Sequence, residues 1–352
     1  TDEEISERKA RKVGLTGPEL AVLLAYSKIW LHEQLLASSL PDDPWVGTAL
    51  ERYFPSALRS RYAAHMPKHP LRREIISTHV VNSMVNRVGA TFVHSLMEAT
   101  GAKAHEVVRA YLLQREIFDF VLIWREIERL DNHVADKLQA DMLIESGRLA
   151  VRATTWFLRS RHNAADMAET IRHFAPCVEA LRKALPELLE GKARAPFEER
   201  AASYVSGGIP ESLARSVVAC ETLFAALDIV DISTASERTV ATVAGVYFGL
   251  AAALDLPWMR EGIGLLAADG HWQTLSKQAM RDDLTALQRS LASQVLACGG
   301  ADDAPAKLIS AWQSGKAAPL ERAMRLLNEL RAVPAPDQAM LSVALRELRN
   351  LA

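Results

Sequence analysis

Hydrophobic residues recur along almost the whole chain with the spacing of an α-helix. Val81, Met84, Val85, Val88 and Phe92, for example, fall at i, i+3, i+4, i+7 and i+11, which places them on one helix face. β-branched runs of period 2 are missing, apart from a short ambiguous stretch at 229–232. The pattern predicts an all-α, multi-helix, bundle-like region with no substantial sheet and no Rossmann unit.

The first strong helix signal lies near the N-terminus. Thr16-Gly17-Pro18-Glu19 has the composition of a capping box with proline in the first turn. It predicts a helix from Leu20 to about Ser38 that is apolar almost all round, with a few polar positions at Ser27, Lys28, His32, Glu33 and Gln34. A helix of this kind is usually buried between others.

Capping, proline and glycine signals divide the remaining chain into further helices. They are expected at 44–53, 69–100, 103–130, 133–161, 165–174, 177–189, 197–206, 210–220, 222–228, 237–254, 257–267, 271–297, 305–314, 319–332 and 337–351. The polar stretch 159–166 suggests sub-bundles at 1–162 and 164–352 within one all-α region over 1–352, and 191–196 is a second candidate linker.

Composition narrows the class of protein. Lys and Arg number 41 and Asp and Glu 43, a net charge of −2 that speaks against a dedicated nucleic-acid binder. Cys177, Cys220 and Cys298 form no CxxC pair, which disfavours a disulfide framework or zinc site and suits a reducing, cytoplasmic location. The longest uncharged apolar run, between Arg238 and Asp255, is shorter than the roughly 20 residues of a spanning helix, so no membrane partner is expected.

Motifs for catalysis are not evident. Gly262-Ile263-Gly264 lacks the third glycine and the preceding strand of a dinucleotide fingerprint, and no phosphate-binding loop or nucleophile elbow occurs. His65 and His69 have a zinc-ligand spacing, but Pro67 and Pro70 interrupt the helix that this spacing needs. The sequence therefore predicts no catalytic, cofactor-binding or metal-binding residue in this chain.

One basic stretch could contact a ligand or a partner. Residues 52–73 contain no Asp or Glu, and the basic side chains proposed for an anion or partner contact are Arg59, Arg61, Lys68, Arg72 and Arg73, with Arg52 preceding them. The alternative is a solvated surface balanced by acids from elsewhere in the fold, which the near-neutral chain favours.

A polar stripe, His79, Asn82 and Asn86, lies beside the apolar face of the helix expected over 69–100. The stripe could line a ligand pocket. More often, such residues bond to a neighbouring helix and set its register.

Several strings in collinear order resemble one enzyme family. They are LTGPELAVLLAYSK at 15–28, LPDDP at 40–44, HPLRREII at 69–76, NSMVNRVG at 82–89, RATTW at 152–156, ALDIV at 226–230 and RDDL at 281–284. Together they resemble the C-terminal region of the large bacterial NAD-dependent glutamate dehydrogenases, from about Leu15 to Ala297 with a looser tail.

The resemblance implies a specific role for the chain. The parent enzyme oxidatively deaminates L-glutamate to 2-oxoglutarate and ammonia and reduces NAD, with its catalytic lysines and dinucleotide fold upstream. This segment would be non-catalytic and bind no cofactor itself. It would pack on the upstream catalytic region of the same polypeptide or on another subunit, and the family makes a homo-oligomer the expectation.

Three hypotheses follow. In the first, the segment is a scaffold, and without its partner it should expose an apolar patch and self-associate. In the second, it is a regulatory module whose candidate effector site is the basic stretch. In the third, it is a free-standing helical adaptor or an unrelated helical enzyme, against which the family-like strings speak.

Overall fold

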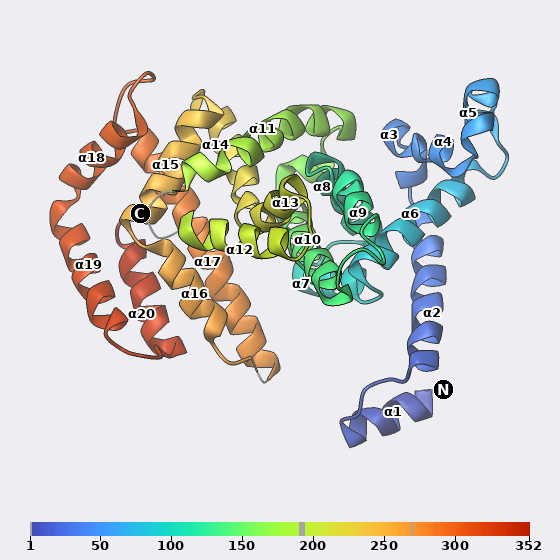
Figure 1. Ribbon diagram of the computed structural model, residues 1–352, viewed down its shortest axis with the longest axis horizontal. Coiled ribbons are helices and arrows are strands. Elements are labelled where there is room, and N and C mark those ends of the chain that lie inside the picture. The colour runs from blue at the N-terminus through green and yellow to red at the C-terminus, as the bar shows by residue number, and fades with distance from the viewer. Residues whose placement is uncertain (1, 190–193, 269) are drawn as a thin grey trace. The chain divides into compact units, whose positions relative to one another are not determined.

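The computed structural model describes residues 2–189, 194–268 and 270–352, and within these ranges the regular structure is helical throughout (Figure 1). The prediction of an all-α fold is confirmed, and the ambiguous stretch at 229–232 lies inside a helix. No single described helix is long and apolar enough to cross a membrane, although the bent pair Val240–Ala253 and Leu256–Leu265 would meet that test together.

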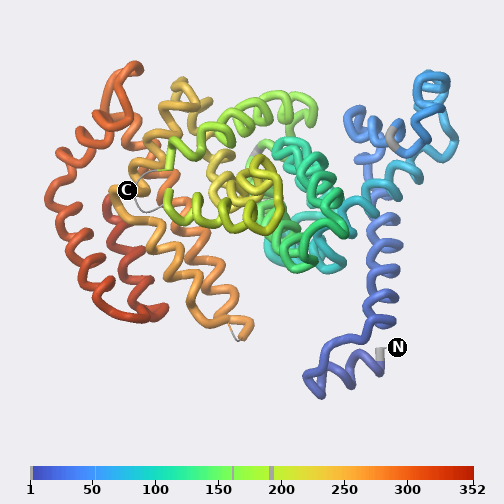
Figure 2. The backbone as a smooth tube through the Cα atoms, viewed as in Figure 1, coloured from blue at the N-terminus to red at the C-terminus, as the bar shows by residue number. Residues whose placement is uncertain are grey.

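The chain divides into two compact units that are interleaved along the sequence. Unit 1 takes the residues up to 129 and then 139–175, and unit 2 takes 130–138 and 176–352. The chain thus passes from one unit to the other three times, as the continuous trace in Figure 2 allows the reader to follow by colour. The sub-bundles 1–162 and 164–352 stay a prediction, and residues 191–193 of the second candidate linker lie outside the described residues.

Unit 1 is built from the N-terminal helices. In chain order they are α1 (Asp2–Arg11), α2 (Gly17–Leu36), η1 (Leu40–Asp42), α3 (Pro44–Gly47), α4 (Ala49–Tyr53), α5 (Ser56–Tyr62), η2 (Met66–Lys68), α6 (Arg72–Val88), α7 (Phe92–Thr100), α8 (Ala104–Ile117), α9 (Phe120–Glu128), most of α10 (Asp136–Arg159), η3 (Arg161–Ala164) and the start of α11 (Met167–Leu188).

Helix α8 is the buried centre of unit 1. Ten of its residues are buried, among them Val107, Tyr111 and Leu113, and it packs against α2, α7 and α9. The stacked rings of Phe118, Phe120 and Trp124 continue this core into α9. Burial on all sides was expected for the helix over 20–38, and the structure gives that environment to α8 instead.

Several helix boundaries differ from the sequence prediction, and two of them have a clear physical cause. The single helix expected over 69–100 is broken between α6 and α7 at Gly89, whose φ of 91° and ψ of 167° no right-handed helix can accommodate. The two helices expected at 165–174 and 177–189 form one helix, α11, with Pro176 inside it. Phe174 and Val178, both fully buried, flank this proline, so packing outweighs the loss of one backbone hydrogen bond.

Unit 2 contains the remaining helices. After the end of α11 they are α12 (Arg194–Ser206), α13 (Glu211–Leu223), α14 (Ala225–Ser236), α15 (Val240–Ala253), α16 (Leu256–Leu265), α17 (His271–Leu296), α18 (Pro305–Gly315), α19 (Ala317–Arg331) and α20 (Gln338–Arg349). Helix α15 is the central element and packs against α14, α16, α17 and α18.

Two glycines let α18 approach α15 closely. A Cβ atom placed on Gly245 would lie 2.7 Å from Cγ of Pro305, and one placed on Gly249 would lie 2.9 Å from Cδ1 of Ile309. Spacing of four residues puts both glycines on one face of α15.

This contact predicts a destabilised Gly245→Ala variant. The proline ring cannot rotate away from the new methyl group, so we expect a loss of about 1–3 kcal/mol in the free energy of unfolding, measured by urea denaturation. The matched control is Gly147→Ala in α10, where nothing lies within 4 Å of the added Cβ. That variant should gain about 0.5–1 kcal/mol, and equal effects at the two sites would contradict the packing argument.

Candidate functional site

Helix α2 has an apolar surface that the described residues of unit 1 leave exposed. Tyr26 is 68% exposed, and Val22 and Ile29 are each 56% exposed. With Leu23 and Trp30 these residues form what we call the outer face of α2. At 100° per residue, the five positions fall within an arc of about 120°. The prediction that this helix is buried between others is therefore wrong over residues 22–30 in this chain, and the expected exposed apolar patch is confirmed.

The opposite side of α2 packs on its own unit. Leu31 and Leu35 are buried, and the helix lies against α6 and α8 (Figure 1). Nζ of Lys28 donates a 2.8 Å hydrogen bond to Oδ1 of Asn86 on α6. Helix α2 thus has apolar residues on two opposite sides. The inner side packs on unit 1, and the outer face is exposed.

One residue of the polar stripe on α6 contributes to the packing of α2 on α6. Asn86 binds Lys28 across the helix pair, which confirms for this residue the interpretation that the stripe holds a neighbouring helix. Asn82 is exposed. His79 lines a small enclosed cavity together with Trp45, Thr48 and Arg115, and other residues of α3, α4, α6 and α8 complete its wall.

The basic stretch does not form one cluster of free cations. Arg72 and Arg73 both contact the carboxylate of Asp42, at 2.5 Å between Nη2 and Oδ1 in the case of Arg72. Nη2 of Arg73 also donates to the carbonyl oxygens of Leu36 and Ser38, at 2.7 and 2.9 Å. These two arginines therefore join the start of α6 to the end of α2.

The other basic residues of the stretch lie apart on the surface. Nε of Arg59 donates to the carbonyl of Phe54 at 2.8 Å, and the guanidinium of Arg61 lies 5.4 Å from the ring centroid of Tyr62. Lys68 is exposed on η2. The side chain of Arg52 lies outside the described residues. An anion or partner contact by Arg59, Arg61 and Lys68 stays a prediction.

The turn before α3 is held by a second arginine. Oδ1 of Asp43 caps α3 by accepting from the backbone N–H groups of Trp45 and Val46, and its Oδ2 lies 3.1 Å from Nη1 of Arg109. Arg109, on α8, also donates to the backbone carbonyls of Asn163 and Ala165. Sequence reasoning missed Arg109, because its partners lie far from it in the sequence.

A largely buried group of charged side chains joins α14 and α17 in unit 2. Asp228 is buried and accepts from Nη1 of Arg289 at 2.9 Å and from the hydroxyl of Tyr247 at 3.4 Å, and Arg289 also contacts Asp231. Burial alone would lower the pKa of Arg289. The negative charges and hydrogen bonds of Asp228 and Asp231 outweigh it, so the pKa lies above its ordinary value. The group is a network of two carboxylates around one guanidinium.

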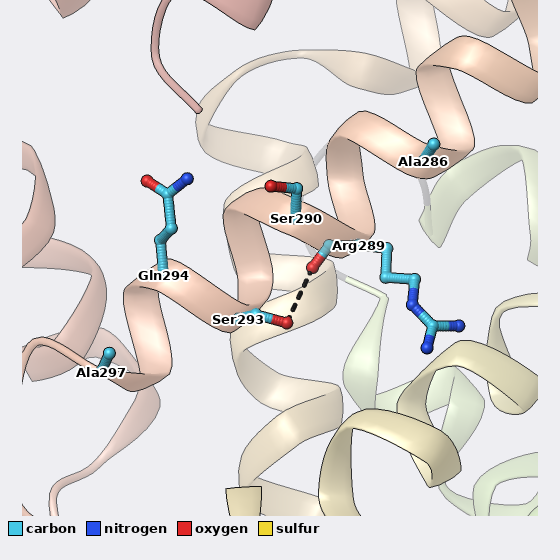
Figure 3. A pocket seen from close by; sticks show the side chains of 6 residues that line it. All are labelled: Ala286, Arg289, Ser290, Ser293, Gln294 and Ala297. Carbon is cyan, nitrogen blue, oxygen red and sulfur yellow. Dashed lines mark hydrogen bonds between the residues drawn. The ribbon is translucent and has the colours of Figure 1, made fainter. Parts of the chain in front are cut away.

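An open groove of about 590 Å³ lies beside α17 (Figure 3). Its lining residues come from this helix and the residue that follows it: Ala286, Arg289, Ser290, Ser293, Gln294 and Ala297. Two of the polar residues bond within the chain: Ser293 donates to the carbonyl of Arg289, and Gln294 bonds to the carbonyl of Ala352 and to Lys316. In a binding or catalytic pocket, polar side chains from several elements point towards one place. The side chains that line this groove come from one stretch of the chain and are not arranged in that way.

Metal-binding constellations are equally sparse. In the described ranges, no three His, Cys, Asp or Glu side chains gather as metal ligands. Nδ1 of His69 accepts from the backbone N–H of Leu71 at 3.1 Å, and His65 lies against the ring of Tyr62. The His65 and His69 pair is part of a loop, as the intervening prolines predict.

Comparison with known proteins decides the family. Residues 12–350 match the family model described as glutamate dehydrogenase, C-terminal. The chain belongs to this glutamate dehydrogenase C-terminal family. It is 41% identical over all 352 residues to the NAD-specific glutamate dehydrogenase of Pseudomonas aeruginosa. It is also 35% identical to the enzymes of the same name from Halomonas elongata and Mycobacterium tuberculosis, over 352 and 351 residues.

The chain spans about a fifth of these relatives, 22% of the length of each, and corresponds to their C-terminal part. The resemblance inferred from the sequence strings is thereby confirmed. Within those strings, several polar residues have clear structural partners in this member of the family: Glu19 with Thr16, Asp42 with Arg73, Asn86 with Lys28, Asp228 with Arg289, and Asp283 with Arg349.

The start of α2 predicts a pH-dependent cap. The Glu19 carboxylate accepts from the backbone N–H and hydroxyl of Thr16 at 2.6 and 2.7 Å, and Arg8 lies 2.7 Å away. These hydrogen bonds, with the Arg8 charge, lower the pKa of Glu19 from 4.5 to about 2. A lowered pKa stabilises the folded cap above pH 4.5 and withdraws that stabilisation as the pH falls towards 2.

We therefore expect the Glu19 side-chain carbonyl signal in NMR to titrate near pH 2. The Glu19→Gln variant should remove the pH dependence of the amide signals at Thr16. A Glu19 midpoint at 4.5 would show that the capping box does not form in solution.

The contacts of Arg73 predict a stability loss on truncation. Arg73→Ala removes the donor for two carbonyls and one arm of the ion pair with Asp42, so the free energy of unfolding in urea should fall by about 1–2 kcal/mol. Arg61→Ala, in the same basic stretch but exposed, is the control and should change it by less than about 0.5 kcal/mol. Equal changes in the free energy of unfolding for the two variants would contradict a special role of Arg73.

Proposed function

We propose that this chain is the non-catalytic C-terminal segment of an NAD-dependent glutamate dehydrogenase. The parent polypeptide would convert L-glutamate, NAD and water to 2-oxoglutarate, ammonia and NADH. The observation that carries the proposal is 41% identity over the whole chain to an NAD-specific glutamate dehydrogenase of which this chain covers 22%. NAD binding and the chemistry would belong to the upstream region.

The role proposed for the segment itself is structural. Its conspicuous polar groups, such as Asp42, Asp43 and Asp228, make ion pairs and caps within the units rather than lining a common cavity. The outer face of α2 offers a large apolar surface for packing on another part of the enzyme. We further propose that the parent enzyme is a cytoplasmic homo-oligomer. The three cysteines form no CxxC pair, which suits a reducing compartment, and the family resemblance supports the oligomer.

The proposal is tested by measuring NADH formation with the full-length polypeptide and with the 352-residue chain. The full-length protein should form NADH when both L-glutamate and NAD are supplied, whereas the chain alone should form none above background. NADH formation by the chain alone would refute the non-catalytic role. A well-folded full-length protein without activity on glutamate would refute the assignment of the parent reaction.

A further inference from the structure

Helix α2 is held in place before any partner binds. Its first turn is fixed by the capping box of Thr16 and Glu19, and its last carbonyls accept from Arg73. Lys28 and the buried Leu31 fix its inner side on unit 1. A rigid helix presents its outer face without the ordering cost that a flexible segment would pay on binding.

The outer face needs a covering surface of matching chemistry. Val22, Leu23, Tyr26, Ile29 and Trp30 include no charged side chain, and they occupy the side of α2 opposite Leu31 and Leu35. Large contiguous apolar surfaces of this kind mark interaction sites. Two aromatic residues in the patch are typical of the anchors found at the centre of protein interfaces.

The position of α2 in the family favours a partner on the same polypeptide. The relatives carry more than three-quarters of their length outside the matched part, and that matched part is C-terminal. The longer region therefore precedes α2, which lies close to the start of the matched residues 12–350. A short covalent connection gives a surface on the preceding region a high effective concentration at α2, which a separate copy lacks.

We propose that the outer face of α2 is the contact by which the upstream region of the same polypeptide binds this segment, a proposal that rests on the proposed function. Helix α2 is then a shared element, with its inner face in the core of unit 1 and its outer face in an apolar groove of the upstream region. The covering surface consists of aliphatic and aromatic side chains, because no charge on the outer face would compensate a buried one.

The test uses cysteine variants of the full-length polypeptide and a water-soluble maleimide, with each labelled site identified by mass spectrometry. Ile29→Cys places the thiol on the outer face, and Ile144→Cys, on α10, is the control because Ile144 is similarly exposed in this chain, 51% against 56%. Each rate is divided by the rate of the same variant in denaturant. The normalised rate at position 29 should be at least about tenfold lower than at position 144. Equal normalised rates would overturn the proposal.

A photoreactive benzoylphenylalanine in place of Tyr26 identifies what covers the face. Crosslinks within one chain, to peptides preceding this segment, are expected. Crosslinks between two chains would overturn the proposal in favour of a second copy, and the absence of any crosslink would overturn it in favour of a solvent-exposed face. Glutamate-dependent NADH formation is measured on the same samples. If the enzyme forms NADH but position 26 gives no crosslink to the upstream region, only the proposed interface is refuted. If position 26 crosslinks to the upstream region but no NADH is formed, only the proposed function is refuted.

Discussion

Arginine side chains that donate to backbone carbonyls hold the ends of helices in both units. Arg73 binds the end of α2, Arg109 binds the carbonyls of η3 and the residue after it, and Arg238 binds those of Leu296, Gly299 and Gly300 after α17. The last carbonyls of a helix have no partner within the helix, and a planar guanidinium can satisfy several at once. In a fold of helices and loops, these contacts are hydrogen bonds to the backbone that connect one element to another, as strand pairing does in a sheet.

The same principle applies to several aspartates of the chain. Asp42 and Asp43 lie next to each other, yet one binds the arginines of α6 and the other caps α3 and binds Arg109. In unit 2, Arg289 and Tyr247 bond to the two oxygens of the buried Asp228, which offsets the cost of burying its charge. In each case, the aspartate and its arginine partners join one helix to the next.

Local signals predicted much of this structure from the sequence. The capping box at Thr16 depends on neighbouring residues and the all-α class on helix periodicity, and both are confirmed. The burial of α2 and the continuity of α11 through Pro176 depend on tertiary packing, which periodicity does not contain. The ion pair of Asp42 with Arg73 joins residues 31 positions apart, so the sequence showed a basic stretch but not the acid that balances it.

The interleaving of the two units also bears on how such a segment can change in evolution. Residues 130–138 belong to unit 2 although the chain on both sides of them belongs to unit 1, and Leu138 and Val134 lie against Gly207 and Gly208. No single cut in the gene separates the two units, because a fragment ending near residue 175 would keep 130–138 and lose the glycines they pack on. A gene fusion, duplication or deletion that keeps the units folded must therefore include both of them.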